Sequence, residues 1–327
     1  MRFRRDAPVV RAASESARAA PPSARDAAAP ANVRGADRRA AAFRIDDPGP
    51  LATVQDLGRP GLASRGIARS GALDRGALRR GNRLVGNDEG AAAIEITLGG
   101  LRATAHRDLW IAVSGAPTPA TIAGRAVGPH AAVPWRAGDE LRIGWAPHGA
   151  RCYLTVRGGI DVPVTAGSRA SDRLARIGPP PLAAGDEIAI GTDAVAPVPP
   201  LDLAPWGDPA RPAWLDLAEG PRAPWFAPEA EALLLGTRWR VAADADRVGV
   251  RLEGPALART IPGELPSEGM VPGAVQIPPS GRPTILFCDG PVTGGYPVIA
   301  VVADASLDTL AQVRSGDEVR FRRSRGR

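Results

Sequence analysis

DGPVTGGYPVIAVV, residues 289–302, joins two very different kinds of sequence. Val298–Val302 is a continuous apolar run, which is typical of a strand buried on both faces. The residues before it include a carboxylate, a hydroxyl, two adjacent glycines and a tyrosine. In a small β-barrel the inside is filled, so polar side chains collect where strands meet loops at the rim. The stretch therefore predicts a barrel strand with a candidate site at its N-terminal end.

Short apolar runs separated by glycine and proline turns continue this pattern from about Phe43 onward. The clearest predicted strands are Ile94–Leu98, Trp110–Val113, Leu141–Ile143, Cys152–Val156, Trp239–Val241, Val248–Leu252, Thr284–Phe287 and Val298–Val302. In the first of these, apolar residues alternate with polar ones such as Glu95, which indicates a strand with one solvent-facing side. Gly-Asp-Glu precedes an alternating apolar pair within 136–144, 183–191 and 314–322. We interpret each as a hairpin corner that enters a closing strand, and three independent turns are the alternative.

Helices are few in this prediction. The best candidate is Asp74–Val85, because Asp74 is a good N-cap residue and Gly86 follows the last apolar position. Shorter candidates are Pro228–Leu235 and Leu307–Val313. On the helical face of Leu78 and Val85, Asn82 is expected to be buried and tied to a loop.

The predicted fold is mainly β, with two β-barrel domains and a few short helices. The domains cover 43–195 and 213–323, and the proline-rich stretch 196–212 between them lacks periodicity, as a linker does. Residues 1–42 are rich in Arg, Ala and Pro without periodicity, so we expect a disordered tail. The prolines and acids of this tail argue against the amphipathic helix of a transit peptide.

The net charge of +6 is badly distributed for binding nucleic acid. Residues 1–42 hold nine arginines against four acids and residues 320–327 hold five arginines and no acid, which leaves 43–319 at −4. A nucleic-acid surface needs positive charge clustered on the folded domain, so we expect no nucleic-acid partner. All 41 basic residues are arginine. Without lysine the chain cannot carry covalent biotin, and it must hold any anion with arginine or backbone N–H groups.

The sequence favours neither a metal site nor a membrane protein. Cys152 and Cys288 lack a C-x-x-C spacing and the three histidines form no ligand pattern, so we expect no metal and interpret the cysteines as small buried residues. No stretch approaches the roughly 18 apolar residues of a membrane span, and the N-terminus lacks an apolar signal region. We therefore expect a cytoplasmic protein without a membrane partner.

Four polar segments are the candidates for a functional site: 53–61, 70–87, 167–172 and 267–297. The residues predicted to bind a substrate or anion are Gln55, Arg59, Ser70, Ser168, Arg169, Asp172, Glu268, Gln276, Gly294, Gly295 and Tyr296. The residues predicted to be catalytic are Asp56, Asp74, Asp289 and Thr293. Carboxylates can accept or orient a proton, and guanidinium and backbone N–H groups can hold an oxyanion.

Each candidate has a structural alternative. Asp74 is also compatible with a cap and no other role. The glycines at 294 and 295 are compatible with a bend of positive φ, and Arg59 and Arg169 with ordinary surface residues.

The motifs, in their order along residues 50–322, closely resemble one bacterial family. They are TVQDLGRPG (53–61), SGALD (70–74), LVGN (84–87), AAAIEITLGG (91–100), RGGIDVP (157–163), GSRASD (167–172), RVGVRLEG (247–254), PSEGMVPGAVQIP (266–278) and TGGYPVIAVV (293–302). The family is that of biotin-dependent carboxyltransferases, or allophanate hydrolase subunit 2. It includes the C component of bacterial 5-oxoprolinase, the carboxyltransferase part of urea amidolyase and the antagonist of a sporulation-kinase inhibitor.

The resemblance implies a pair of cyclophilin-like β-barrels and a hetero-oligomeric enzyme. The implied partners are the kinase-inhibitor-like B component of 5-oxoprolinase and a third component, a lactam hydrolase. The complex would hydrolyse 5-oxo-L-proline to L-glutamate while hydrolysing ATP, whose site cannot be located in this sequence. The family more often has an arginine after the aspartate of DGPVTGG, so this chain lacks a cationic side chain next to Asp289.

The expected mechanism is phosphorylation of the lactam oxygen followed by opening of the ring by water. Developing negative charge needs oriented donors in a dry site, and Arg59, Arg169 and the backbone N–H groups near 294–295 are the expected ones. Asp56, Asp74 and Asp289 are the carboxylates expected to accept or orient a proton. The expected pocket is the 289–296 rim together with the loops 53–61 and 167–172.

Two other functions are compatible with the same resemblance. The chain could be the carboxyltransferase component of a urea carboxylase-like enzyme that accepts carboxyl groups from biotin on another protein. It could also be a regulatory binding protein that antagonises a kinase inhibitor. Neighbouring reading frames that encode a biotin carboxylase or a lactam hydrolase would separate the enzymes, and ATP hydrolysis by the reconstituted complex would exclude a binding role alone.

Overall fold

The computed structural model describes residues 40–128, 130–200, 211–261, 263 and 265–324. We call 40–200 the N-terminal half and 211–324 the C-terminal half. The predictions for most of the tail and for linker residues 201–210 lie outside the described residues. Regular structure begins with a strand at Phe43, as the sequence predicts.

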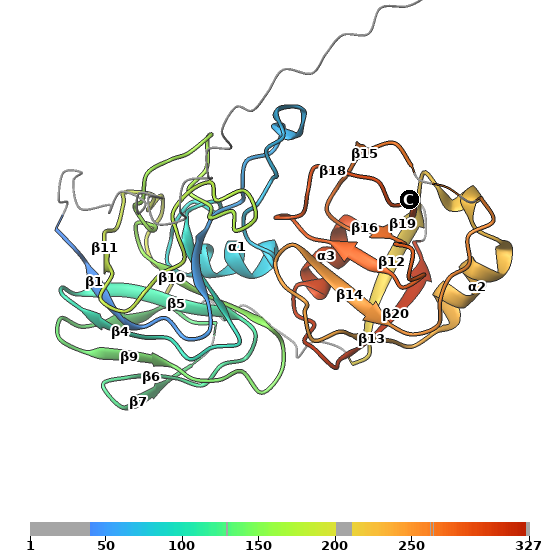
Figure 1. The fold of residues 1–327 in the computed structure, drawn as a ribbon. Coiled ribbons are helices and arrows are strands. Elements are labelled where there is room, and N and C mark those ends of the chain that lie inside the picture. The colour runs from blue at the N-terminus through green and yellow to red at the C-terminus, as the bar shows by residue number, and fades with distance from the viewer. Residues whose placement is uncertain (1–39, 129, 201–210, 262, 264, 325–327) are drawn as a thin grey trace, which may run out of the picture. The chain divides into compact units, whose positions relative to one another are not determined.

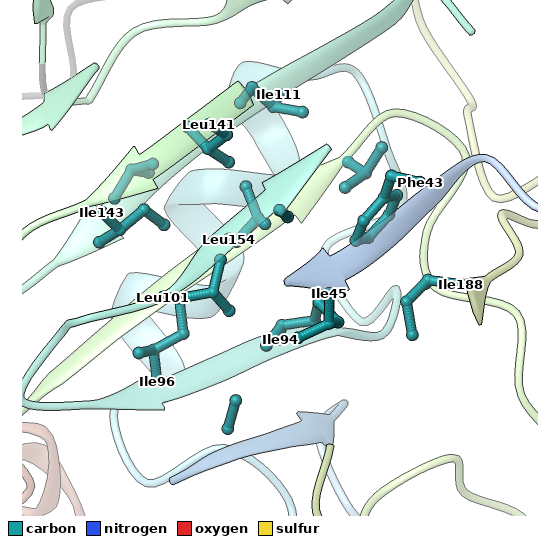
Figure 2. Packing of buried hydrophobic residues seen from close by; sticks show 14 of the residues in the cluster. Phe43, Ile45, Ile94, Ile96, Leu101, Ile111, Leu141, Ile143, Leu154 and Ile188 are labelled. Carbon is teal, nitrogen blue, oxygen red and sulfur yellow. The ribbon is translucent and has the colours of Figure 1, made fainter. Parts of the chain in front are cut away.

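The N-terminal half contains two antiparallel sheets (Figure 1). The six-stranded sheet has the order β11 (Glu187–Ile188), β1 (Phe43–Asp47), β4 (Arg102–Ala105), β9 (Glu140–Ile143), β6 (Ala120–Ile122) and β7 (Arg125–Val127). The five-stranded sheet has the order β2 (Ala52–Gln55), β3 (Ala93–Thr97), β10 (Arg151–Val156), β5 (Leu109–Gly115) and β8 (Val133–Trp135). Both sheets contribute side chains to one apolar core, in which Phe43 and Ile45 pack among Ile94, Leu141 and Leu154 (Figure 2).

The strands of the C-terminal half close into a barrel. Its order is β12 (Ala213–Glu219), β19 (Val298–Val302), β16 (Ala274–Gln276), β17 (Thr284–Leu286), β14 (Gly249–Glu253), β13 (Trp239–Val241) and β20 (Glu318–Arg323). A separate ribbon joins β15 (Glu268–Gly269) to β18 (Thr293–Gly294). The helices are α1 (Arg75–Leu84), α2 (Pro228–Gly236) and α3 (Asp304–Leu310), and short 3₁₀ turns cover Ala63–Arg65 and Ala223–Trp225.

The mainly β prediction is confirmed, and each of the eight predicted strands coincides with an observed one to within two residues at either end. The apolar strand Val298–Val302, β19, pairs with β12 on one side and β16 on the other. Its side chains are buried on both faces except for Val301, which is half-buried. α1 and α2 lie where predicted, whereas α3 begins three residues earlier because its first turn uses Asp304–Ser306.

The three Gly-Asp-Glu turns are corners that enter strands. They lead into β9, β11 and β20. Their glycines, at 138, 185 and 316, have φ of 82°, 90° and 85°, the left-handed region that glycine adopts without strain. Each glycine N–H donates to a carbonyl oxygen of the segment that the new strand then pairs with: Ala105, Ile45 and Val241.

The exposed side predicted for the Ile94–Leu98 strand is wrong. Glu95 on β3 is only 1% exposed. Ile94 and Ile96 face the core between the sheets, while the other face of the strand is covered by α1, which packs on β5 and β10. A carboxylate buried in this way needs a charged or hydrogen-bonding partner.

Candidate functional site

A fully buried arginine, Arg247, joins the two halves. Its guanidinium donates to Glu95, to the carbonyl oxygen of Gly71 at 2.7 Å, and to both carboxylate oxygens of Asp289 at 2.8 and 3.1 Å. Tyr153 on β10 donates to the second oxygen of Glu95 at 2.7 Å. Burial alone would raise the pKa of the Glu95 carboxyl. The positive charges of Arg247 and of a second nearby arginine outweigh this effect, so the pKa of Glu95 lies below its ordinary value.

This network supplies the positive charge that the sequence lacks beside Asp289. No arginine follows Asp289 along the chain, but Arg247 brings a guanidinium from the loop before β14. Asp289 is 0% exposed, and the backbone N–H of Arg173 lies 3.5 Å from its Oδ2. In this geometry both oxygens of Asp289 are occupied, and the residue ties the 167–172 loop and its neighbours to the C-terminal half.

Asp56 holds two of the predicted loops together. Its Oδ1 accepts from the hydroxyl of Ser168 at 2.6 Å and from the backbone N–H of Gly58 at 2.7 Å. Its Oδ2 accepts from the backbone N–H of Arg169 at 2.7 Å. Three donors therefore fix the carboxylate, and the loops 53–61 and 167–172 meet as predicted.

Arg59 lies at the same meeting point and is 2% exposed. Its Nη2 donates to the carbonyl oxygen of Ala170, whereas its Nε and Nη1 have no partner among the described residues. The same touching segments carry four more buried polar atoms without a partner: Gln55 Oε1, Ser70 Oγ, Ser171 Oγ and Asp172 Oδ2. Such atoms are uncommon in folded proteins, and several of them in adjoining loops indicate a place where a ligand or water supplies the missing partners.

Hydrogen bonds show that these segments adjoin one another. The side-chain amide of Gln55 donates to the carbonyl oxygen of Ser171 at 3.1 Å. The backbone N–H of Arg59 donates to the carbonyl oxygen of Arg69 at 2.7 Å, one residue before Ser70. The backbone N–H of Ser70 in turn donates to the carbonyl oxygen of Cys288 at 2.9 Å, next to the Arg247 network.

Arg169 differs from Arg59 although both were predicted as anion donors. Its Nε donates to the carbonyl oxygen of Val162 at 3.1 Å, and its Nη2 lies 3.3 Å from Oδ1 of Asp161. Its side chain is 29% exposed. Its guanidinium is thus already engaged at the edge of the cluster.

Asp74 occupies the N-cap of α1, as predicted, and is buried there. Its Oδ1 accepts from the backbone N–H of Ala77 at 2.7 Å, and its Oδ2 accepts from the side-chain amide of Gln312 at 2.7 Å. Burial, and next the nearby charge of Asp308, raise the pKa of Asp74 to about 6. Asp308 itself accepts from the backbone N–H groups of the first turn of α1 at 2.9 and 3.1 Å. These carboxylates lock α1 to α3, so the capping alternative describes what Asp74 does here.

The remaining predicted residues form a second group around the β15–β18 ribbon. Glu268 pairs with Arg222, whose guanidinium carbon lies 5.6 Å from the centre of the Trp225 ring. Across the ribbon Glu268 is the register partner of Gly294. Gly294 allows a close approach, because a Cβ on it would lie 2.7 Å from Nε2 of Gln276.

The rest of this group is more open to solvent. Thr293 is exposed, Tyr296 is 46% exposed, and Gly295 would bring a Cβ to 3.3 Å from the carbonyl oxygen of Leu265. Gly294 and Gly295 are not among the positive-φ glycines, so the bend alternative does not explain them.

Apart from Asp74 at the N-cap of α1, the predicted residues fall into two groups, and the structure adds Ser171 to the first. The Arg59 cluster comprises Gln55, Asp56, Arg59, Ser70, Ser168, Arg169, Ser171 and Asp172, and it adjoins Asp289. No hydrogen bond or ion pair among the described residues joins this cluster to Gly294 or Gly295. The shared pocket that the sequence predicts stays a prediction.

Two hollows at the surface lie elsewhere. One of about 270 Å³ is lined by Trp110 and Arg157 among others, and one of about 290 Å³ by Arg211 and Gln312 among others. Neither is lined by a predicted site residue. Within the described residues no group of three or more metal-binding side chains occurs, and none of the helices there is long and apolar enough to cross a bilayer.

Four residues of this region were not predicted from the sequence to be part of a site: Glu95, Tyr153, Ser171 and Arg247. Glu95 could have been found, because it is the only charged residue in the apolar stretch 91–96. Arg247 gives no comparable signal, since it follows the charged and turn-forming residues Asp244–Asp246 and resembles any exposed arginine.

The family model of the carboxyltransferase domain, subdomain A and B, matches residues 65–323. The chain belongs to the carboxyltransferase-domain family. It is 39% identical over 285 residues to the C component of 5-oxoprolinase from Escherichia coli, a match that covers 85% of this chain and 90% of that one.

Two solved structures support the family assignment. The crystal structure of TTHA0988 is 40% identical with a TM-score of 0.79, and the match covers 88% of this chain and 56% of that one. The urea amidolyase of K. lactis is 30% identical with a TM-score of 0.80, over 87% of this chain and 19% of that one. The chain thus spans nearly all of the E. coli relative, whereas it spans only part of these two chains.

Proposed function

We propose that this chain is the C component of an ATP-dependent 5-oxoprolinase that hydrolyses 5-oxo-L-proline to L-glutamate. The observation that carries the proposal is the match to the E. coli relative, which covers 90% of that chain at 39% identity. That relative is by name one subunit of 5-oxoprolinase, so its enzyme has several. The partners that we propose are the kinase-inhibitor-like B component and a third component, a lactam hydrolase.

The reaction that we propose opens an amide bond in two stages. ATP transfers its terminal phosphoryl group to the lactam oxygen, water adds to the activated carbon, the C–N bond breaks, and a second water releases phosphate. The phosphoryl group carries negative charge throughout these steps, so preorganised donors in a dry site accelerate them. Of the two arginines predicted as donors, Arg59 keeps nitrogens without a partner among the described residues and can bind the substrate, whereas Arg169 is engaged with Asp161.

The buried Arg59 cluster supports a substrate-binding role for this chain. Its polar atoms without partners belong to three segments that hydrogen bond to one another and to the Arg247 network. The Asp74 and Asp289 carboxylates then support the site indirectly: they hold α1 and the 288–289 segment in place.

The test is reconstitution of the three components with this chain. We expect glutamate release that depends on ATP, on 5-oxoproline and on this chain, with one ADP formed for each glutamate. Omission of this chain is the matched control. Assembly of an intact complex without ATP hydrolysis or glutamate release would exclude the proposal and favour a regulatory binding role.

A second candidate is a biotin-dependent carboxyltransferase component. The match to the urea amidolyase structure, with a TM-score of 0.80, favours it. Because the chain has no lysine, biotin would have to be carried by another protein. Transfer of the carboxyl group from a carboxylated biotin carrier to urea, in place of glutamate release, would support this candidate.

A further inference from the structure

The two fully buried arginines at this junction differ in their partners. Arg247 directs its nitrogens at two carboxylates and a carbonyl oxygen. Arg59 makes one side-chain hydrogen bond, to Ala170, and has no ion pair with a described carboxylate. A buried charge without a partner costs several kcal/mol, so an anion that binds beside Arg59 would gain much of that energy.

Arg59 can bind a carboxylate while it keeps its hydrogen bond to the carbonyl oxygen of Ala170. Guanidinium has five N–H donors, and each of its two bidentate edges combines Nη2 with one of the other nitrogens. Both of those other nitrogens, Nε and Nη1, are without a partner. Nη2 also keeps a second hydrogen besides the one directed at Ala170. Arg59 can therefore bind a carboxylate through two hydrogen bonds along the edge on which this second hydrogen lies.

The neighbouring atoms without partners require the opposite kind of group. Oε1 of Gln55 and Oδ2 of Asp172 are acceptors and need an N–H or O–H donor. The hydroxyls of Ser70 and Ser171 can donate or accept. A ligand that satisfies the cluster thus carries a carboxylate and, close to it, an N–H group.

We propose that Arg59 binds the carboxylate of a small carboxylic acid, and that Asp172 or Gln55 accepts a hydrogen bond from an N–H group next to that carboxylate. This inference rests on the proposed function, under which the ligand is 5-oxoproline, whose carboxylate stands on the carbon next to the lactam N–H. Arg59 is in this view the residue that selects 5-oxoproline over neutral lactams. Arg59 affects the reaction indirectly, because it fixes the position of the lactam ring.

An exposed turn follows the cluster between Asp172 and Ile177. These residues pair as a β-bridge, and the side chain of Asp172 caps the turn by accepting from the Ala175 N–H at 2.8 Å. Residues 173–176 between them are exposed. Because Arg59 is buried, a ligand reaches its nitrogens only if the loops around it move.

The test is calorimetric titration of the reconstituted complex, without ATP, with two probes. One is 5-oxoproline and the other is 2-pyrrolidinone, which has the same ring and N–H but no carboxylate. We expect Arg59→Gln to weaken 5-oxoproline binding by about 10- to 100-fold, the range for charge-assisted hydrogen bonds, and to leave 2-pyrrolidinone unchanged. The matched control is Arg136→Gln, because Arg136 is 66% exposed and pairs only with a surface aspartate, Asp108.

A second variant covers the case in which Arg59→Gln fails to fold. Asp172→Asn keeps the size of the side chain and leaves one oxygen for Ala175, but it turns an acceptor into a donor. We expect it to weaken both probes by a similar factor, about tenfold, because both carry the N–H. The proposal is supported if Arg59→Gln weakens the binding of 5-oxoproline alone and Asp172→Asn weakens the binding of both probes.

The outcomes separate this inference from the proposed function. If the wild-type complex releases glutamate and Arg59→Gln binds 5-oxoproline as tightly as wild type, the inference is overturned and the function stands. Equal weakening of both probes by Arg59→Gln also overturns it. If the wild-type complex neither binds 5-oxoproline nor releases glutamate, both fail.

Discussion

Arg247 and Arg59 lie at the same junction and are equally hidden from water, at 1% and 2% exposure. Around Arg247 the chain supplies an acceptor for each nitrogen, and these acceptors come from both halves of the molecule. Around Arg59 it supplies one acceptor and leaves further polar atoms without a partner. Burial therefore does not distinguish a structural charge from one that is available for binding. Pairing does, because only the guanidinium of Arg247 is fully paired.

The largest effect is expected at Arg247. Replacing it by Met leaves Glu95 and Asp289 buried without their guanidinium, so the free energy of unfolding should fall by about 3–5 kcal/mol. Urea denaturation followed by circular dichroism measures this. The control is Arg322→Met, which removes a solvent-exposed pair with Asp216 and should lower the free energy of unfolding far less, because exposed ion pairs add little stability. A loss at Arg247 no larger than at Arg322 would show that the network does not join the halves.

A second test concerns Asp74, a buried carboxylate whose oxygens accept from an amide and a backbone N–H and make no ion pair with a guanidinium. Its pKa is raised to about 6 in the folded chain, from an ordinary value of 3.8. The folded state therefore keeps the proton to higher pH than the unfolded state, and stability falls as the pH rises between about 4 and 6.

The size of this fall is about 3 kcal/mol if Asp74 acts alone. The side chain of Asn in the Asp74→Asn variant cannot lose a proton, so the variant should not show this fall. The difference in free energy of unfolding, variant minus wild type, should therefore increase by up to this amount between pH 4 and pH 7. Urea denaturation at four pH values measures the difference. Parallel curves for the two proteins would contradict the raised pKa.

A smaller effect is expected at Arg169. Its ion pair with Asp161 is partly exposed, so Arg169→Gln should lower the free energy of unfolding by about 1 kcal/mol or less. Binding of 5-oxoproline should weaken no more than a few-fold, well below the effect of Arg59→Gln. A loss of binding as large as that of Arg59→Gln would move the anion site from Arg59 toward Arg169.

Much of the fold could be predicted because the local signals agree with the tertiary structure. Val298–Val302 is apolar throughout and is buried on both faces, and Gly-Asp-Glu marks three strand entries. α1 begins after the cap at Asp74, and Asn82 is 0% exposed and donates to the carbonyl oxygens of Glu89 and Ala91, as expected. Short strands such as β15 and β18, of two residues each, carry no periodic signal and were missed.

The site could be predicted only in part. Composition indicated which loops carry polar groups, and Asp56 shows that the loops 53–61 and 167–172 do meet. Which groups are paired depends on contacts between distant segments, such as Arg247 with Glu95 across 152 positions. The same alternation that predicts an exposed Glu95 is produced by a strand whose second face is covered by a helix, so pattern alone cannot distinguish the two.

The central claim is that Arg247 is needed for the fold whereas Arg59 is available for a ligand. The most direct measurement is the free energy of unfolding of Arg59→Met without any ligand, by urea denaturation next to wild type and Arg247→Met. We expect a value within about 1 kcal/mol of wild type, because one lost hydrogen bond is offset by removal of an unpaired buried charge. A loss of about 3–5 kcal/mol, equal to that expected for Arg247→Met, would contradict it and make Arg59 a structural residue.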